Sequence, residues 1–315
     1  MASPDGVPPL VVLAGTTASG KTGLSLALAA ELAVLGVKSE IVSADSRQVY
    51  RGMDIGTAKV TPEERSRVPH HGLDLVDPDR PFSVAEYAGH AREALAGIDE
   101  RGAVALLVGG TGFYLRSVAR GLNVDELPWD PQVRASVDSL LATEGLPALV
   151  RELRALAPTR AAAVDLRNPR RVVRALEMAR LRGDAPLPEP RGYGRTVLWL
   201  GLQVEQPVLR ERIQARARAQ FDAGLVEETQ ALAARFDPGS PSFSGIGYAE
   251  SLALVAGRLT RDEAIALDAR RNLLLARHQA TWFRREPDIR WFDATRALPV
   301  EEAVAAVRAH LLDPS

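Results

Sequence analysis

The sequence predicts an α/β protein in which helices cover a parallel sheet and an all-helical segment is inserted into the chain. Three observations support this fold class. Strand-length apolar runs alternate with segments of helical periodicity, as in parallel sheets covered on both faces. A glycine-rich loop joins the first apolar run to the first helical segment. No strand pattern occurs between residues 125 and 195.

The strands and helices of the core follow from apolar periodicity and from capping signals. The first helix ends near Gly36, and Ser83 with Glu86 three residues later predicts a capped helix over 81–102. Strands are expected over four apolar runs, at 8–15, 38–45, 103–110 and 197–204.

The pattern of the remaining segments predicts helices. Residues 125–195 contain helical stretches punctuated by Pro and Gly, so we expect a helical insertion there within a core of 1–124 and 196–315. The C-terminal third is mostly helical, with a long stretch over 206–236, a glycine turn at 244–250 and two more helices.

Composition is that of an ordinary soluble protein, with 315 residues, 46% hydrophobic and 25% charged. No apolar run approaches the ~20 residues of a membrane span. The first residues, "MASPDGVPP", are interpreted as a short disordered tail rather than a signal peptide. The absence of cysteine excludes disulfides, thiolate metal sites and a Cys nucleophile. A cytoplasmic monomer is the expectation.

Charge is balanced overall but not along the chain. The net charge is −1, yet residues 151–195 hold eleven Arg against five acidic residues. Such a cluster is compatible with a solvated helical surface or with contacts to a phosphate backbone.

A phosphate-binding motif follows the first strand. Residues 15–22, "GTTASGKT", fit G-x-x-x-x-G-K-[ST] between a strand and a helix, the context that a P-loop requires. The fold is therefore expected to be P-loop NTPase-like. Backbone amides and the Lys21 charge would bind phosphate, and Thr22 would reach Mg²⁺. The predicted cradle comprises Gly15, Thr16, Thr17, Ala18, Ser19, Gly20, Lys21 and Thr22.

The acidic residue that usually accompanies an ATPase P-loop is missing from its strand. The run over 103–110 ends in Gly109, Gly110, Thr111 and Gly112. The carboxylate stands instead at the end of another strand, as Asp45. Because this strand does not end in an acidic residue that could help to bind Mg²⁺, the sequence disfavours an ATPase.

Several motifs together closely resemble the bacterial tRNA dimethylallyltransferases, also called tRNA isopentenyltransferases. The resemblance covers about residues 10–293 and keeps the family's order. It is carried by "GTTASGKT", "SADSRQVYRGMDIGTAK", "VPHHGLDL", "LLVGGTGFYLRSVARGL", "NPRRVVRALE", "RARAQFDAGLVEE", "IGYAE" and "HQATWFRRE".

The resemblance implies a reaction and roles for its residues. A dimethylallyl group would move from dimethylallyl diphosphate to the exocyclic amine of the adenosine 3′-adjacent to the anticodon, position 37, in tRNAs that read codons beginning with U. Asp45 would be the general base. The P-loop, Lys21, Mg²⁺ and Thr111 would hold the leaving diphosphate, and Arg216 would clamp it further.

The resemblance also implies how tRNA is bound. The target adenosine must be flipped out of the anticodon loop into a pocket. Positions that match the family's tRNA contacts are Asp45, Ser46, Arg47, Gln48, Arg134, Arg170, Arg171 and Arg174.

The chain departs from the family pattern at a few positions. Thr16 stands where Pro is usual, Gln220 where Met is common, and Leu273 and His278 where basic residues are usual. The last three leave details of RNA contact open.

Other polar and aromatic residues have more than one interpretation. His70 and His71 are interpreted as structural or as pocket wall, in preference to a metal site. Trp282 and Phe283 are assigned to the core in preference to base stacking. A structural ion pair of Asp54 with Lys59 and an RNA or phosphate contact by Lys59 both remain open. The paired Glu227 and Glu228 are expected on a solvated helix face.

Three other functions compete with tRNA prenylation: an adenylate isopentenyltransferase, a P-loop kinase of a small metabolite, and a non-catalytic RNA-binding ATPase. The basic insertion disfavours the first, since a mononucleotide does not need it. The strand end without an acid disfavours the second. The third leaves Asp45 without a role.

Overall fold

The computed structural model describes residues 7–312, so residues 1–6 of the predicted tail lie outside the described residues. The chain divides into two units, one of residues 1–122 with 191–315 and one of residues 123–190. The first is an α/β unit and the second is helical. No helix between residues 7 and 312 is long and apolar enough to cross a membrane.

Six parallel strands form the sheet of the α/β unit, in the order β3-β2-β4-β1-β5-β6. Leu10 in the central strand pairs with Ala105 on one side and Val197 on the other. The strands are β1 (Leu10–Gly15), β2 (Ser39–Ser43), β3 (His70–His71), β4 (Val104–Gly109), β5 (Val197–Gln203) and β6 (Ile289–Asp293). The predicted α/β class and its four strands are confirmed.

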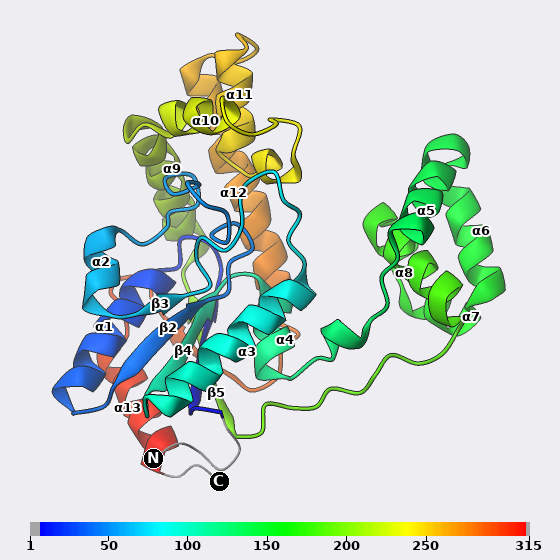
Figure 1. The fold of residues 1–315 in the computed structure, drawn as a ribbon. Coiled ribbons are helices and arrows are strands. Elements are labelled where there is room, and N and C mark those ends of the chain that lie inside the picture. Colours follow the sequence, from blue (N-terminus) through cyan, green and yellow to red (C-terminus); the bar gives the residue numbers. More distant parts are fainter. Residues whose placement is uncertain (1–6, 313–315) are drawn as a thin grey trace. The chain divides into compact units, whose positions relative to one another are not determined.

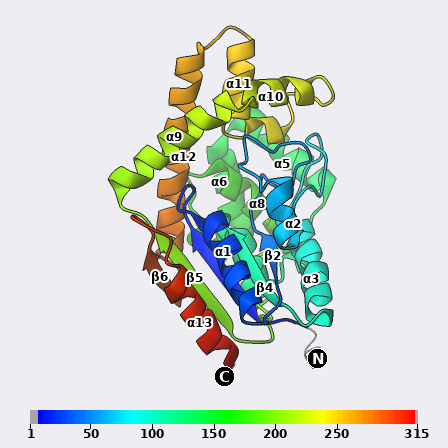
Figure 2. The same ribbon diagram turned by 90° about the vertical axis from the view of Figure 1, so that its left-hand side faces the viewer.

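Helices cover both faces of the sheet because alternate residues of each buried strand point in opposite directions. Val11 and Leu13 pack with α1 (Lys21–Val34) and α13 (Val300–Leu312) on one face, which is turned toward the viewer in Figure 2. Leu10 and Val12 belong to the core of the other face. That core includes residues of α3 (Val84–Glu100), α4 (Gly112–Ala119), α9 (Gln206–Asp222) and α12 (Arg261–Phe283).

Local signals account for the helix boundaries. Ser83 and Glu86 form the predicted capping box at the start of α3, and Thr260 with Glu263 forms another at α12. The expected helix over 206–236 is instead two helices, because Gly224 adopts a φ of 99° between α9 and α10. The shorter elements are α2 (Pro62–Arg67), α10 (Leu225–Ala233), the 3₁₀ helix η2 (Pro241–Ser244) and α11 (Tyr248–Val255).

The sequence prediction missed the outermost strands of the sheet. β6 lies within a region expected to be helical, and its burial pattern contains no fully buried residue. β3 has only two residues. Edge strands of this kind lack the continuous apolar run that identifies a central strand.

The helical unit has a hydrophobic core of its own, formed by residues such as Leu149, Leu153, Val172 and Leu176. Its elements are η1 (Val124–Glu126), α5 (Pro131–Glu144), α6 (Leu146–Leu156), α7 (Pro158–Ala163) and α8 (Pro169–Arg182), drawn in green in Figure 1. Asp130 caps α5 and Asn168 caps α8.

Candidate functional site

A cavity of about 790 Å³ lies in the α/β unit at the carboxyl ends of three adjacent strands. The predicted P-loop follows β1, Asp45 follows β2, and Thr111 follows β4. Ligands of parallel α/β sheets bind at this edge. The cavity lining includes Thr17, Ala18, Gly20, Lys21, Thr22, Asp45, Ser46, Arg47, Gln48, Thr111 and Arg216. The fold therefore brings the predicted phosphate cradle and the predicted base to one site.

The P-loop conformation depends on residues with positive φ. Ala18 has a φ of 61° and Gly20, the N-cap of α1, has a φ of 97°. A side chain on Gly20 would be strained and would approach Leu298 Cδ2 to 2.7 Å. Lys21 Nζ donates a hydrogen bond to the Thr16 carbonyl at 2.7 Å. The loop thus leads into the N-terminus of a helix, where backbone amides favour an anion.

The Lys21 ammonium lies in an environment that disfavours its charge. The pKa of Lys21 is lowered to about 8, mainly by burial; the Asp45 charge acts in the opposite direction, and the Arg216 charge acts in the same direction as burial. An anion bound beside Lys21 would favour the charged form. The site is therefore electrostatically suited to a polyanion.

Arg216 of α9 is a second cation at the cavity. Its Nη2 donates to Thr17 Oγ1 at 2.6 Å and to Asn272 Oδ1 at 3.1 Å. Burial lowers the pKa of Arg216. The buried Nε has no hydrogen-bond partner, and no carboxylate between residues 7 and 312 forms an ion pair with this side chain. A partly buried cation with a buried, unpartnered Nε and no paired carboxylate indicates an anion site.

Asp45 and Thr111 are placed together by the ends of β2 and β4. The Asp45 carboxylate accepts a hydrogen bond from the Arg47 amide at 2.8 Å, and Thr111 Oγ1 accepts one from the Ser46 amide at 3.1 Å. Gly109 permits this approach, since an added Cβ would overlap the Ala44 carbonyl. The half-buried Asp45 thus has a fixed direction toward the cavity.

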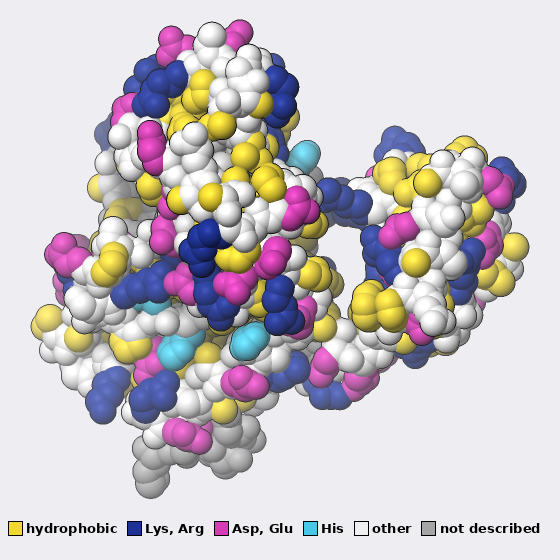
Figure 3. Space-filling model, turned by 45° about the horizontal axis from the view of Figure 1, so that its top comes forward, with side chains coloured by type: hydrophobic (Ala, Val, Ile, Leu, Met, Phe, Trp, Pro, Cys, Tyr) yellow, Lys and Arg dark blue, Asp and Glu magenta, His cyan; other side chains and the backbone are white. Residues whose placement is uncertain are grey.

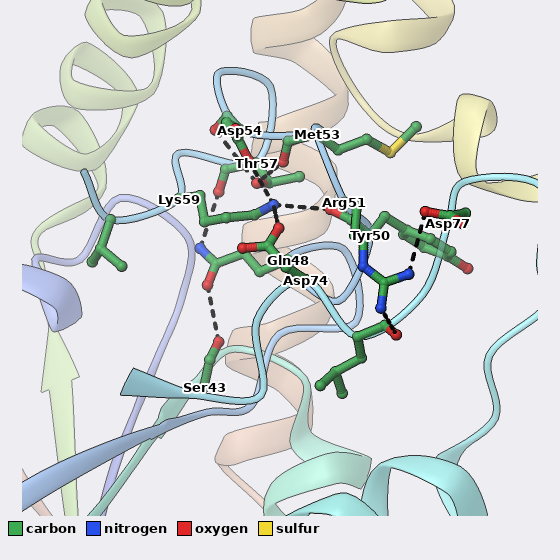
Figure 4. Close-up of polar contacts among 12 residues, drawn as sticks. Ser43, Gln48, Tyr50, Arg51, Met53, Asp54, Thr57, Lys59, Asp74 and Asp77 are labelled. Atoms are coloured by element: carbon green, nitrogen blue, oxygen red, sulfur yellow. Dashed lines mark hydrogen bonds and ion pairs between the residues drawn. The ribbon is translucent and has the colours of Figure 1, made fainter. Parts of the chain in front are cut away.

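The polar segment 45–59 folds around the Lys59 ammonium, as Figure 4 shows. Lys59 Nζ donates to Asp54 Oδ1 at 2.6 Å, to Asp74 Oδ1 at 2.7 Å and to the Tyr50 carbonyl at 2.9 Å. Its side chain has no exposed surface. Of the two interpretations left open for Lys59, the structure supports the internal ion pair.

Gln48 is fixed within the same segment. Its Oε1 accepts from Ser43 Oγ at 2.9 Å, and its Nε2 donates to the Thr57 carbonyl at 3.2 Å. Gln48 is therefore oriented by the segment's own backbone before any substrate is present.

Two residues of α9 and α10 hold the segment from outside. Glu228 was expected on a solvated face, and this prediction is wrong. Its carboxylate accepts from the Ile55 amide at 2.9 Å and from Tyr248 Oη at 2.7 Å. Gln220 is buried and donates to the Ile55 carbonyl at 2.6 Å. The sequence could not predict this contact, because Glu228 binds the backbone amides of residues 54–56 and not their side chains.

Gln279 is a further residue that sequence reasoning missed. From α12 it accepts a hydrogen bond from the Thr17 amide at 2.7 Å and donates to the Gly110 carbonyl at 3.0 Å. It connects the P-loop to the end of β4. Of the departures from the family pattern, Leu273 is partly buried against the core and His278 is exposed.

The arginines of the helical unit differ in their partners. Arg170 and Arg171 are exposed. Arg134 and Arg174 approach the buried Glu177 carboxylate at 3.5 and 3.4 Å. Figure 3 shows Lys and Arg side chains on the surface of this unit. Their contact with tRNA, like the tRNA-binding role of the predicted insertion 125–195, stays a prediction.

The histidines and the aromatic pair have clear surroundings. His71 Nε2 lies 2.7 Å from Glu40 Oε2, and His70 lines the cavity. Phe283 is buried in the core, as predicted. Trp282 is partly buried and packs against Gly112, where an added Cβ would overlap its ring.

The donor set suits a magnesium ion shared with a phosphate ligand. The described residues contain no cluster of three or more His, Cys, Asp or Glu side chains that could hold a metal alone. Thr22 lines the cavity at the start of α1. Mg²⁺ is usually bound by one or two protein oxygens together with substrate phosphates, so Thr22 fits the predicted ion.

Comparison with known proteins places these features in one family. A family model described as IPP transferase matches residues 48–286. The chain is 45% identical to a tRNA dimethylallyltransferase of Salinispora arenicola, covering 95% of this chain and 86% of that protein. It is 41% identical to one of Bifidobacterium longum, covering 95% and 90%. The crystal structure of a Bacillus halodurans tRNA isopentenylpyrophosphate transferase superposes with a TM-score of 0.69 at 36% identity, covering 96% and 95%.

Proposed function

Because the chain belongs to the IPP transferase family, we propose that it is a tRNA dimethylallyltransferase. The reaction transfers the dimethylallyl group of dimethylallyl diphosphate to the exocyclic amine of adenosine 37. A C–N bond forms, the C–O bond to diphosphate breaks, and the amine loses one proton. One observation carries the proposal: a carboxylate, Asp45, and a diphosphate cradle with two cations, Lys21 and Arg216, line a single cavity.

The cradle would hold the diphosphate as it leaves. Backbone amides of the P-loop, Lys21 and Arg216 would stabilise the charge that develops on the leaving oxygen. Thr111, which follows β4, would donate a hydrogen bond from its hydroxyl to the same group. Thr22 would bind Mg²⁺, which when present neutralises part of the diphosphate charge.

Asp45 would act on the nucleophile. An adenine amine is a weak nucleophile because its lone pair is delocalised into the ring, so removal of its proton during attack assists the reaction. The bond from the Arg47 amide orients the Asp45 carboxylate. Ser46, Arg47 and Gln48 also line the cavity, where they would contact the flipped nucleotide.

The arginines of the helical unit would contact the RNA backbone. Arg170 and Arg171 are exposed on α8, and binding through such residues weakens steeply with salt. Arg134 and Arg174 would have to leave or share the Glu177 carboxylate to contact phosphate. Action as a monomer in the cytoplasm stays a prediction.

A mass measurement separates this proposal from its competitors. The protein would be incubated with Mg²⁺, dimethylallyl diphosphate and an unmodified tRNA with an A-rich anticodon loop. In parallel, AMP replaces the tRNA and ATP replaces the prenyl donor. We expect one prenyl group on adenosine 37 and none on AMP. Prenylated AMP would identify an adenylate isopentenyltransferase. Phosphate release in the ATP reaction, together with no prenyl transfer in the reaction with dimethylallyl diphosphate, would identify a kinase or ATPase.

A further inference from the structure

We infer that Asp268 and Asn272 of α12 are positioning residues that orient Arg216 toward the leaving diphosphate. The inference rests on the proposed function. It starts from a chain of three side-chain hydrogen bonds that ends at the P-loop. Asn272 Nδ2 donates to Asp268 Oδ1 at 2.8 Å, Arg216 Nη2 donates to Asn272 Oδ1 at 3.1 Å, and the same Nη2 donates to Thr17 Oγ1 at 2.6 Å.

Asp268 sets the direction of this chain. An ionised carboxylate only accepts hydrogen bonds, so it holds the Asn272 amide with Nδ2 toward Asp268, where the Asp268 backbone carbonyl accepts a second, longer bond from Nδ2 at 3.3 Å. Its Oδ1 then faces Arg216, where an acceptor is needed. An amide at position 268 can donate or accept, so it would allow Asn272 to turn over and present its NH₂ group to the guanidinium.

Stability does not explain the Asp268 carboxylate. Asp268 is 1% exposed, and its carboxylate forms no ion pair with any residue between 7 and 312. Its Oδ2 lies beside Gly247, where an added Cβ would come within 3.2 Å. A buried, unpaired carboxylate is unfavourable for folding, which suggests that its use lies in the site.

The charged groups around Asp268 come from three helices. Glu250 of α11 acts against its ionisation, while Arg216 of α9 and Arg271 of α12 favour it. Arg271 is already paired with Glu250 at 2.6 Å. Arg216 is therefore the cation whose position remains to be fixed by the Asp268–Asn272 chain.

A double-mutant cycle tests the coupling of Asp268 to Arg216. Calorimetry would measure the binding of inorganic diphosphate with Mg²⁺ to the wild type, Asp268→Asn, Arg216→Gln and the double variant at pH 7.5. We expect Asp268→Asn to weaken binding about tenfold, the value of one charge-assisted hydrogen bond. In the Arg216→Gln background the same change should have less than about a twofold effect. The matched control is Asp262→Asn, which removes an exposed acid of the same helix.

Opposite outcomes overturn the inference. If Asp268 acted only through its charge, its removal would tighten diphosphate binding, because a negative charge near the anion would be lost. Equal effects in both backgrounds would also contradict the coupling. If Asp268→Asn does not fold, Asn272→Leu removes the same link and should weaken binding similarly. A wild type that neither binds diphosphate nor transfers the prenyl group would instead disprove the proposed function.

The pH dependence of diphosphate binding gives a second readout. It would not be affected if Asp268 had only a structural role. Wild-type binding should weaken relative to Asp268→Asn between pH 7.5 and 5.5, as protonation of Asp268 releases Asn272. The protonation of the diphosphate itself is common to both proteins and cancels in their ratio. A ratio that stays constant over this range would contradict the orienting role.

Discussion

Gln279 Oε1 accepts a hydrogen bond from the Thr17 amide at 2.7 Å, although the two residues are 262 positions apart. The contact joins α12 to the P-loop, and the Gln279 amide also donates to the Gly110 carbonyl. We expect Gln279→Leu to lower kcat/KM about tenfold, because two cradle segments lose a shared hydrogen-bonding partner. Steady-state prenyl transfer measures the effect. Gln214→Leu, at an exposed position of α9, is the control, and equal activity of both variants would show that the contact is dispensable.

Lys59→Met should lower the stability of the protein. The change leaves the Asp54 and Asp74 carboxylates and the Tyr50 carbonyl without their common donor. We expect a loss of about 2–4 kcal/mol in the free energy of unfolding, because the Lys59 side chain is fully buried, although the Asp54 and Asp74 side chains are 58% and 30% exposed. Urea denaturation measures it.

A neighbouring pair provides the control for Lys59. Arg51 and Asp77 lie 3.3 Å apart, with about half of each side chain exposed, and Figure 4 shows both pairs. Asp77→Asn should change stability by less than about 1 kcal/mol. Similar losses of stability in Lys59→Met and Asp77→Asn would mean that the burial of Lys59 does not make its ion pairs more stabilising than the exposed pair.

Diphosphate binding should weaken as pH rises above about 8. Burial lowers the pKa of Lys21 to about 8, so above that pH the free protein increasingly loses the ammonium that the anion needs. The bound anion favours the charged form, so binding takes up a proton there, and affinity falls by up to tenfold per pH unit. Calorimetry in buffers of different ionisation enthalpy measures the uptake. Lys21→Met should remove this dependence, and a variant that keeps it would assign the proton to another group.

Asp268→Asn should make the protein more stable at neutral pH while making it a weaker enzyme. Burial raises the pKa of Asp268 from 3.8 to about 6. Between these values the folded state holds more protons than the unfolded state, so stability falls as pH rises through the window. Removing the ionised carboxylate should add up to about 3 kcal/mol at pH 8. Thermal unfolding at pH 8 and pH 5 measures the difference, and a variant that loses stability at pH 8 would contradict it.

The central part of the fold could be predicted from the sequence, but the network around the site could not. The buried strands β1 and β4 are continuous apolar runs, and the P-loop has a fixed spacing between strand and helix. By contrast, Glu228 contacts residues 54–56 through backbone amides, which carry no side-chain pattern. Gln279 and Asn272 lie on one helix face and reach partners in distant segments. Such contacts are set by packing that a single sequence does not reveal.

The order of the strands places a limit on how the site can vary. The loop that carries Asp45 follows β2, and the P-loop follows β1, with β4 between them. Neighbouring strands are about 4.8 Å apart, so the two loops start roughly 10 Å from each other. Under the proposed function, the reacting carbon of the donor would lie within that gap. Changes in the loops could then alter which nucleotide or prenyl chain binds, but the distance between Asp45 and the P-loop is set by the spacing of the strands and would change only with the strand order.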